Sequence, residues 1–167
     1  MDIEALSRRV QALEDIAAIE RLKAAYCDGC DRDHDPDSVV PLFTPDGVWS
    51  AVGFYDLCGR AEIHAHFVKI NRENKLQRTM HMIANPSIKV DGDKATGEWR
   101  YMMAYSSPSK EGTTKYYRII GRYRDDFVRI DGQWYIETLR TWAFERNAYL
   151  CEPSKVPPEH RVAYESA

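Results

Sequence analysis

Apolar side chains recur at steps of three and four over the first part of the chain, from residue 3 to residue 26. This spacing places them on one face of a helix with 3.6 residues per turn, so the pattern predicts one long amphipathic helix. The positions that define the stripe are Leu6, Val10, Leu13, Ile16, Ile19, Leu22 and Tyr26.

Two shorter helices follow. Asp35 is a suitable N-cap and Pro36 a suitable first helical residue, which predicts a second helix that Pro41 keeps brief or bent. Between the second helix and residue 59, the segment "DGVWSAVG" indicates a short strand. A third helix is predicted over residues 59–74, with one apolar face formed by Ile63, Phe67 and Ile70.

After residue 76 the pattern changes to long strand-like segments joined by turns of the hairpin type, "VDGDK" and "DGQW". The first strand is interrupted at Asn85-Pro86, and the third is expected to bulge at Gly121 or near Asp125-Asp126. Helices followed by a meander of strands predict the α+β class, with a curved antiparallel sheet that can hold helices on its concave face. The predicted strands cover residues 78–90, 95–106, 113–130 and 134–144.

These strands are rich in tyrosine, tryptophan, methionine and arginine, as in "EWRYMMAY" and "KYYRIIGRYR". A plain half-buried sheet would carry more Val, Ile and Leu. The mixture fits a wide pocket with an apolar lining and a few polar groups, and it fits an oligomer interface equally well.

The length of 167 residues predicts one domain, over residues 1–150, followed by a proline-rich tail over residues 151–167. This tail either closes the pocket, crosses to a neighbouring chain or is disordered. The net charge of −3 and the lack of a Lys/Arg run argue against nucleic acid as a partner. No apolar stretch approaches the roughly 20 residues of a membrane span, and the charged start of the chain does not resemble a signal peptide. We therefore expect a cytoplasmic protein without a disulfide framework.

Several residue groups offer metal or redox chemistry, but a structural interpretation is stronger for each. Cys27 and Cys30 end a helix and have no second Cys pair to complete a zinc site. His64 and His66 point to different sides of a helix, which favours surface or rim positions over chelation. The acidic run over residues 28–37 lacks the glycine and glutamate of a calcium loop. No metal site is predicted.

His81 stands between two methionines in a predicted strand, and alternation places it on the face of Thr79 and Ile83. It could be a hydrogen-bonded core residue, a metal ligand or a base that faces a cavity. A catalytic histidine needs a partner, best a carboxylate, that fixes its tautomer and stabilises its cation. Spacing alone does not select that carboxylate among the 26 Asp and Glu residues.

Five segments, taken in order, resemble the nuclear-transport-factor-2-like superfamily in its SnoaL-like, polyketide-cyclase-like branch. They are "LEDIAAIERLKAAYCDGCD", "FTPDGVWS", "GRAEIHAHF", "TMHMIANPSIKVDGDKATGEWRY" and "RIDGQWYIETL". The resemblance implies a cone-shaped α+β barrel, with helices packed in a strongly curved antiparallel sheet and a pocket at the open end. It is strongest to bacterial bile-acid 7α-dehydratases, and weaker to hexachlorocyclohexane dehydrochlorinase and scytalone dehydratase.

These relatives use a His–Asp pair in the pocket and no cofactor, and the bile-acid enzymes add a tyrosine. The matching positions here are His81, Asp31 and Tyr26. The bile-acid enzymes also carry a pocket arginine in the last strand, where this chain has Trp142-Ala143, with Arg140 slightly earlier. From strand position and side-chain chemistry, the predicted substrate-binding residues are Trp49, Tyr105, Arg122, Arg140 and Trp142.

The resemblance therefore implies a cofactor-independent lyase that eliminates water from a small hydrophobic cyclic substrate, steroid- or polyketide-like. A double-bond isomerase or cyclase would use the same proton abstraction. A non-catalytic ligand-binding or subunit-like domain is the third possibility, since fold alone does not give function. The related dehydratases also imply a homo-oligomer, with a trimer favoured.

Overall fold

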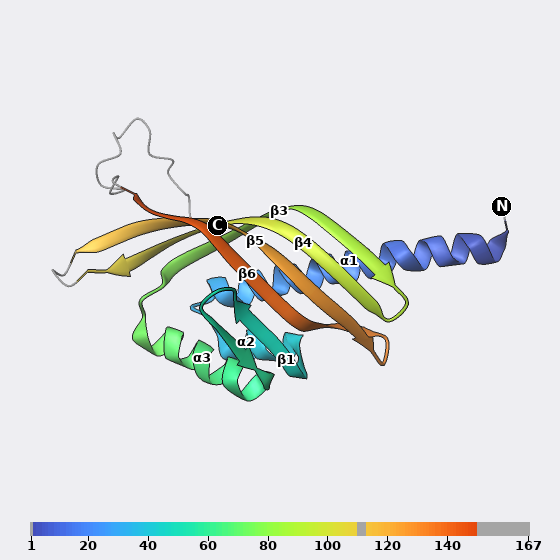
Figure 1. Ribbon diagram of the computed structural model, residues 1–167, viewed down its shortest axis with the longest axis horizontal. Helices are drawn as coiled ribbons and strands as arrows, with labels where there is room; N and C mark the ends of the chain where they lie inside the picture. Colours follow the sequence, from blue (N-terminus) through green and yellow to red (C-terminus); the bar gives the residue numbers. More distant parts are fainter. Residues whose placement is uncertain (1, 110–112, 150–167) are drawn as a thin grey trace, which may run out of the picture.

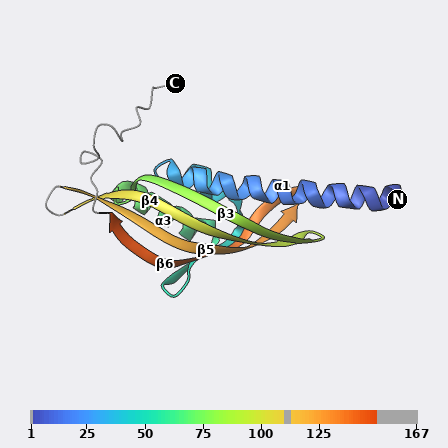
Figure 2. The same cartoon turned by 90° about the horizontal axis from the view of Figure 1, so that it is seen from above.

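Helix α1 (Ile3–Asp31) is longer than the periodicity predicted and continues without a break through Asp31. In this computed structural model, which describes residues 2–109 and 113–149, α1 packs against the sheet from Asp15 onward, and its N-terminal turns extend beyond the sheet (Figures 1 and 2). Ile19 and Tyr26 are buried there, whereas Leu6 and Val10 in the first half are exposed. The core therefore uses only part of the predicted apolar stripe.

The two shorter helices agree with the prediction. Asp35 caps α2 (Pro36–Val39), accepting a hydrogen bond from the backbone N–H of Asp37 at 3.1 Å, and the 3-10 turn η1 (Val40–Leu42) follows directly. Helix α3 (Gly59–Glu73) buries Ile63 and Phe67. It ends at Asn74, whose left-handed φ of 47° stops the helix.

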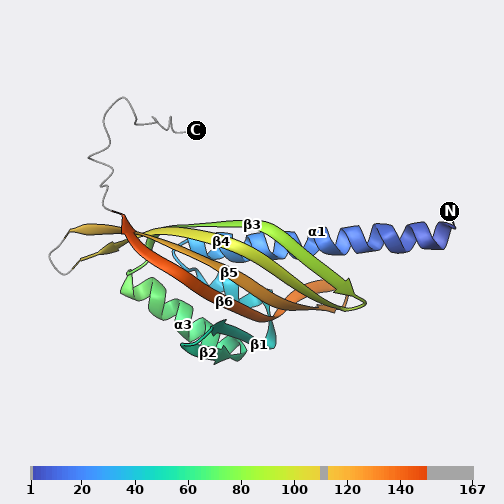
Figure 3. The same cartoon turned by 45° about the horizontal axis from the view of Figure 1, so that its top comes forward.

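Six strands form one curved sheet in the order β2-β1-β6-β5-β4-β3 (Figure 3). The α+β prediction is confirmed, but two details were wrong: the sheet is mixed and open rather than an antiparallel barrel. Strand β1 pairs with β6 in parallel, which is possible because α3 and four strands separate them in the chain. Strand β2 was not predicted. The strands are β1 (Phe43–Ala51), β2 (Tyr55–Cys58), β3 (Gln77–Asp91), β4 (Lys94–Pro108), β5 (Thr114–Ile130) and β6 (Gln133–Tyr149).

The break predicted in β3 is confirmed, because its register against β4 shifts between Ala84 and Ser87. The register between β5 and β6 shifts at Gly121 and after Asp126, but the extra residues, Phe144 and Glu137, lie in β6, so the predicted bulge in β5 was wrong. A Cβ atom at Gly121 would lie 2.0 Å from the carbonyl oxygen of Trp142, so only glycine fits there. Such bulges bend the strands and give the sheet its curvature.

The core between α1, α3 and the sheet contains a buried ion pair. Lys23 Nζ lies 2.7 Å from Asp125 Oδ2, and both side chains are 0% exposed. The ammonium also lies 3.4 Å from the ring centroid of Tyr123, and Asp125 Oδ1 accepts a hydrogen bond from the Arg140 backbone N–H at 3.3 Å. Both charges thus have partners, as a buried pair requires. Sequence reasoning did not find this pair.

The C-terminal tail, predicted as a lid or a disordered segment over residues 151–167, lies outside the described residues. Among the helices that are described, none combines the length and the apolar character needed to cross a membrane.

Candidate active site

A cavity of about 240 Å³ lies between α1, α3 and the concave face of the sheet. Its lining is mostly apolar and aromatic, with a few polar groups, which is the usual character of a small-molecule site. The aromatic residues that contribute are Tyr26, Trp49, Phe54, Tyr55, Phe67, Tyr101 and Tyr123. Three imidazoles line the same cavity, those of His34, His66 and His81.

Asp31 binds His81 through both of its carboxylate oxygens. Oδ1 lies 2.6 Å from the ring Nδ1 of His81, and Oδ2 accepts the backbone N–H of His81 at 2.8 Å. The imidazole is 6% exposed. With Nδ1 occupied by the carboxylate, Nε2 is the ring nitrogen left for a ligand in the cavity.

Asp31 reaches His81 from behind rather than from inside the cavity. Because α1 is unbroken, the helical period turns the side chain of Asp31 away from the Tyr26 face. Asp31 accordingly does not line the cavity. Strand β3 passes on that side of α1, and Thr79 Oγ1 donates to the Cys30 carbonyl at 3.1 Å. This contact fixes β3 to the end of α1 at a position two residues before His81, on the same face of the strand.

The pKa of Asp31 results from opposing effects. Burial by itself would raise the pKa of this carboxyl, but the hydrogen bonds from the ring and backbone of His81 outweigh burial and lower the pKa below its ordinary value. Asp31 is therefore a carboxylate at neutral pH. A charged acceptor at Nδ1 holds the imidazole proton on that nitrogen and directs the lone pair of Nε2 toward the cavity.

Tyr26 and Trp49, both predicted site residues, are joined inside the cavity. Trp49 Nε1 donates a hydrogen bond to Tyr26 Oη at 2.8 Å. Burial raises the pKa of Tyr26 well above its ordinary value, so the phenol stays protonated. Its oxygen already accepts one hydrogen bond, and its hydroxyl also interacts with the Cys30 thiol, which a ligand in the cavity would have to replace as acceptor.

The structure places four predicted lining residues outside this cavity. Tyr105 is buried and stacks on Tyr117 with ring centroids 5.1 Å apart, and Arg140 Nη1 pairs with Asp126 at 2.7 Å. Arg122 lies over the Trp142 ring at 4.8 Å. Strand position and side-chain chemistry suggested these residues. Arg122, Arg140 and Trp142 alternate with inward-facing residues and lie on the outer face of the sheet, whereas Tyr105 shares the inner face with Tyr101 and Met103 but lies further along β4.

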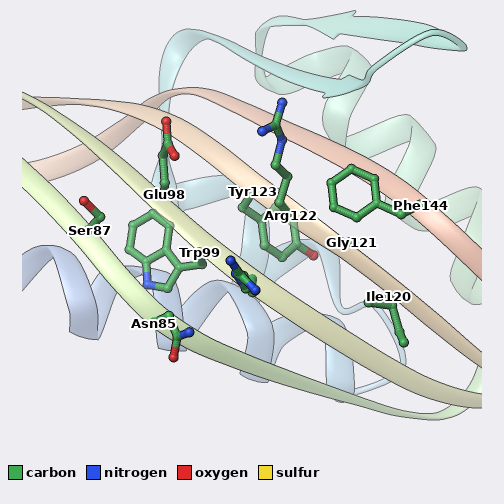
Figure 4. A pocket seen from close by; sticks show the side chains of 10 residues that line it. Asn85, Ser87, Glu98, Trp99, Ile120, Gly121, Arg122, Tyr123 and Phe144 are labelled. Atoms are coloured by element: carbon green, nitrogen blue, oxygen red, sulfur yellow. The ribbon is translucent and has the colours of Figure 1, made fainter.

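Arg122 instead borders a second cavity of about 460 Å³ on the outer face of the sheet. Figure 4 shows the side chains that line it, among them Glu98, Arg122 and Phe144. Glu98 alternates along β4 with the buried Trp99, which confirms that this cavity opens away from the core.

Sequence reasoning missed two cavity histidines. His66, expected on the surface or at a rim, packs 5.4 Å from the Trp49 ring and lies 3.4 Å from the Tyr55 hydroxyl. Its place next to the buried Phe67 was the available signal. His34 lies in the turn after α1, where no periodicity applies, and is 5% exposed.

His34 predicts a pH dependence of stability. Burial, and then the nearby His81, lower the pKa of His34 from 6.5 to about 4. The unfolded chain therefore binds a proton between those values that the folded chain does not, and stability falls as pH falls from about 6.5 to about 4. The loss is at most roughly 3 kcal/mol. The free energy of unfolding, measured with urea across this pH range, should fall less in His34→Phe than in the original chain. An equal dependence of this free energy on pH in both chains would contradict the lowered pKa of His34.

The groups considered earlier for metal or redox chemistry have the following surroundings in the structure. Burial raises the pKa of Cys27 to about 11 and raises that of Cys30 further, so neither thiol is a reactive thiolate at neutral pH. His64 is exposed and does not line the cavity. In residues 2–109 and 113–149, no three His, Cys, Asp or Glu side chains are grouped to hold a metal ion.

Solved structures of other proteins share this fold. A hexachlorocyclohexane dehydrochlorinase from Novosphingobium barchaimii is 19% identical with a TM-score of 0.74, over 90% of this chain and 99% of that one. A scytalone dehydratase-like protein from Novosphingobium aromaticivorans is 22% identical with a TM-score of 0.72, over 91% and 97%. A nuclear-transport-factor-2-like protein with a cystatin-like fold, from the same organism, is 24% identical with a TM-score of 0.66, over 86% and 91%.

At these identities the likeness shows the fold, and the specific likeness to bile-acid 7α-dehydratases stays a prediction. The family assignment has separate support, because the model of the SnoaL-like domain matches most of the chain. The chain therefore belongs to the SnoaL-like domain family, whose model it matches over residues 11–140.

Proposed function

We propose that this protein is a cofactor-independent lyase that eliminates water from a small hydrophobic cyclic substrate. The observation that carries the proposal is the His81–Asp31 contact of 2.6 Å at the wall of a largely apolar cavity. A charged carboxylate behind a neutral imidazole is an arrangement suited to a general base. Two of the similar structures bear names of elimination enzymes, which is consistent with this proposal.

In the proposed reaction, Nε2 of His81 removes a proton from a substrate carbon. The electron pair of that C–H bond becomes the second bond of a new C=C, and the neighbouring C–O bond breaks. The departing oxygen takes the proton and leaves as water, which returns His81 to its neutral form. While His81 carries the extra proton, Asp31 stabilises the imidazolium. The low-dielectric cavity makes this electrostatic stabilisation stronger than it would be in water.

Tyr26 is proposed to donate a hydrogen bond to the departing hydroxyl. Trp49 holds the phenol oxygen in place, and the raised pKa of Tyr26 keeps the phenol protonated. To donate to the substrate, the hydroxyl would turn from the Cys30 thiol to the departing oxygen. Because the donor is neutral and fixed, it can stabilise negative charge as the C–O bond lengthens without rearrangement.

The test is a turnover screen of the purified chain against cyclic alcohols that carry a neighbouring carbonyl or conjugated system. Dehydration produces a conjugated chromophore and a product lighter by one water, both of which can be followed directly. A product of unchanged mass with a moved double bond would indicate an isomerase or cyclase instead. Binding without any conversion across the screen would contradict the lyase and favour a ligand-binding domain.

We also propose that the chain forms a homo-oligomer, with a trimer favoured. The support is apolar surface that a lone chain leaves exposed, on the first half of α1 at Leu6 and Val10 and on the sheet at Met80 and Phe144. Light scattering on the purified chain at micromolar concentration should give a mass near three chains. A monomer mass across the accessible concentration range would contradict the proposal.

A further inference from the structure

His34 has a defined orientation at the cavity wall although it lies in a turn. Its backbone N–H donates to the Cys30 carbonyl at 3.0 Å, and Asn71 Nδ2 donates to the carbonyl of the preceding Asp33 at 2.8 Å. Its φ of 58° is in the left-handed region, which non-glycine residues adopt rarely and which is often found at functional sites. The turn is thus fixed from two helices, and the imidazole packs 6.1 Å from the ring of Phe67.

The two ring nitrogens of His34 have different surroundings. Nδ1 is buried and has no hydrogen-bond partner among the described residues. Nε2 is not enclosed in this way, and because the residue lines the cavity, Nε2 is the nitrogen that a ligand can reach. A neutral imidazole carries one proton, and a buried N–H without an acceptor is rarer than a buried lone pair without a donor. The proton is therefore expected on Nε2, as a donor directed at the cavity.

We propose that His34 Nε2–H binds a carbonyl oxygen of the substrate, on the carbon next to the C–H bond that His81 attacks. This inference rests on the proposed elimination and specifies its substrate class as a cyclic β-hydroxyketone. Removing a proton beside a carbonyl moves negative charge onto the carbonyl oxygen, and a fixed donor at that oxygen stabilises the charge as it develops. Neutral imidazole is known to polarise carbonyl groups in this way.

The charges around His34 are consistent with a neutral donor. His81 and His66 disfavour a positive charge on His34, whereas Asp31 and Asp33 favour one, and burial makes the neutral form prevail. When His81 becomes an imidazolium during the reaction, its charge further disfavours protonation of His34. The three polar groups would then have separate roles: His81 takes the proton, His34 holds the carbonyl, and Tyr26 contacts the leaving oxygen.

The experiment compares two probes that differ in one carbonyl group, the bicyclic ketone 1-tetralone and the hydrocarbon tetralin. Their affinities for the full chain are measured by titration calorimetry, with His34→Phe as the test variant and His64→Phe as the control on the exposed face of α3. We expect His34→Phe to weaken 1-tetralone binding by about 3- to 10-fold, the usual effect of one hydrogen bond. Tetralin binding should change less than about twofold, because tetralin has no oxygen that could accept a hydrogen bond from His34.

Nitrogen-15 NMR of histidine-labelled protein gives a second readout that does not depend on folding of a variant. His34 should show the Nε2–H tautomer, and its Nε2 signal should move when 1-tetralone is added and stay in place with tetralin. An Nδ1–H tautomer, equal losses for both probes in His34→Phe, or no binding of 1-tetralone to the original chain would each overturn the proposal.

These results are separable from the proposed function. If 1-tetralone binds through His34 but no β-hydroxyketone is dehydrated, the elimination fails and the carbonyl site stands. If dehydration proceeds equally well in His34→Phe with unchanged ketone affinity, the elimination stands and the role of His34 is wrong.

Discussion

Replacing His81 by Ala is expected to lower kcat/KM for dehydration by about 10²- to 10⁴-fold, the usual contribution of a general base. Replacing Asp31 by Asn should cause a loss of similar order. An amide at this position loses the negative charge that stabilises the imidazolium, and its NH2 can force the opposite tautomer of His81. Both variants should bind 1-tetralone with nearly unchanged affinity, because neither removes the cavity.

The matched controls are Asp33→Asn, which changes an exposed carboxylate in the turn after Asp31, and His64→Ala on α3. Each should keep turnover close to that of the original chain. Circular dichroism and the urea midpoint of every variant show whether the fold is retained. Original rates in folded His81→Ala and Asp31→Asn would remove both residues from the mechanism.

Replacing Lys23 by Met is expected to destabilise the fold by about 3–5 kcal/mol, because it leaves a carboxylate buried without its partner. Burial already raises the pKa of Asp125 even with Lys23 at 2.7 Å. Met has a similar length and no charge, so the loss reflects the charge rather than a cavity. Urea unfolding followed by tryptophan fluorescence measures this change in stability. The ring centroid of Trp99 lies 5.5 Å from Lys23 Nζ, so its fluorescence reports on this part of the core.

The double variant Lys23→Met, Asp125→Leu provides the control. Replacing both members of a buried ion pair by apolar residues is often neutral or stabilising, so it should recover most of the loss. It also keeps the prediction testable if the single variant does not fold. A Lys23→Met chain as stable as the original would show that the pair contributes little.

The elements with strong local signals were predicted well. The cap at Asp35, the apolar face of α3 and the break in β3 at Asn85-Pro86 each depend on a few neighbouring residues, and each lies where the sequence placed it. The parallel pairing of β1 with β6 was not predicted, because it joins segments that no local pattern relates. Strand β2 was missed because four residues are too few to show a period.

The candidate site was accessible to sequence reasoning only in part. The positions of His81, Asp31 and Tyr26 came from family resemblance, since periodicity directed Asp31 away from the Tyr26 face. In the structure Asp31 contacts His81 from outside the cavity wall, so its orientation away from the Tyr26 face is compatible with that contact, and the catalytic roles of the three residues stay a prediction. Lys23, in contrast, occupies a position that composition alone assigns to the surface, and it is 0% exposed.

The single unbroken helix that carries both Lys23 and Asp31 fixes the distance between them along the chain. One inserted residue in this interval would rotate everything beyond it by about 100° and advance it by about 1.5 Å. Either the ammonium would leave Asp125 or the carboxylate would leave His81, since both partners are held by the same sheet. Chimeras that exchange this helix between relatives should therefore tolerate substitutions on its exposed side but no change of length between these two anchors.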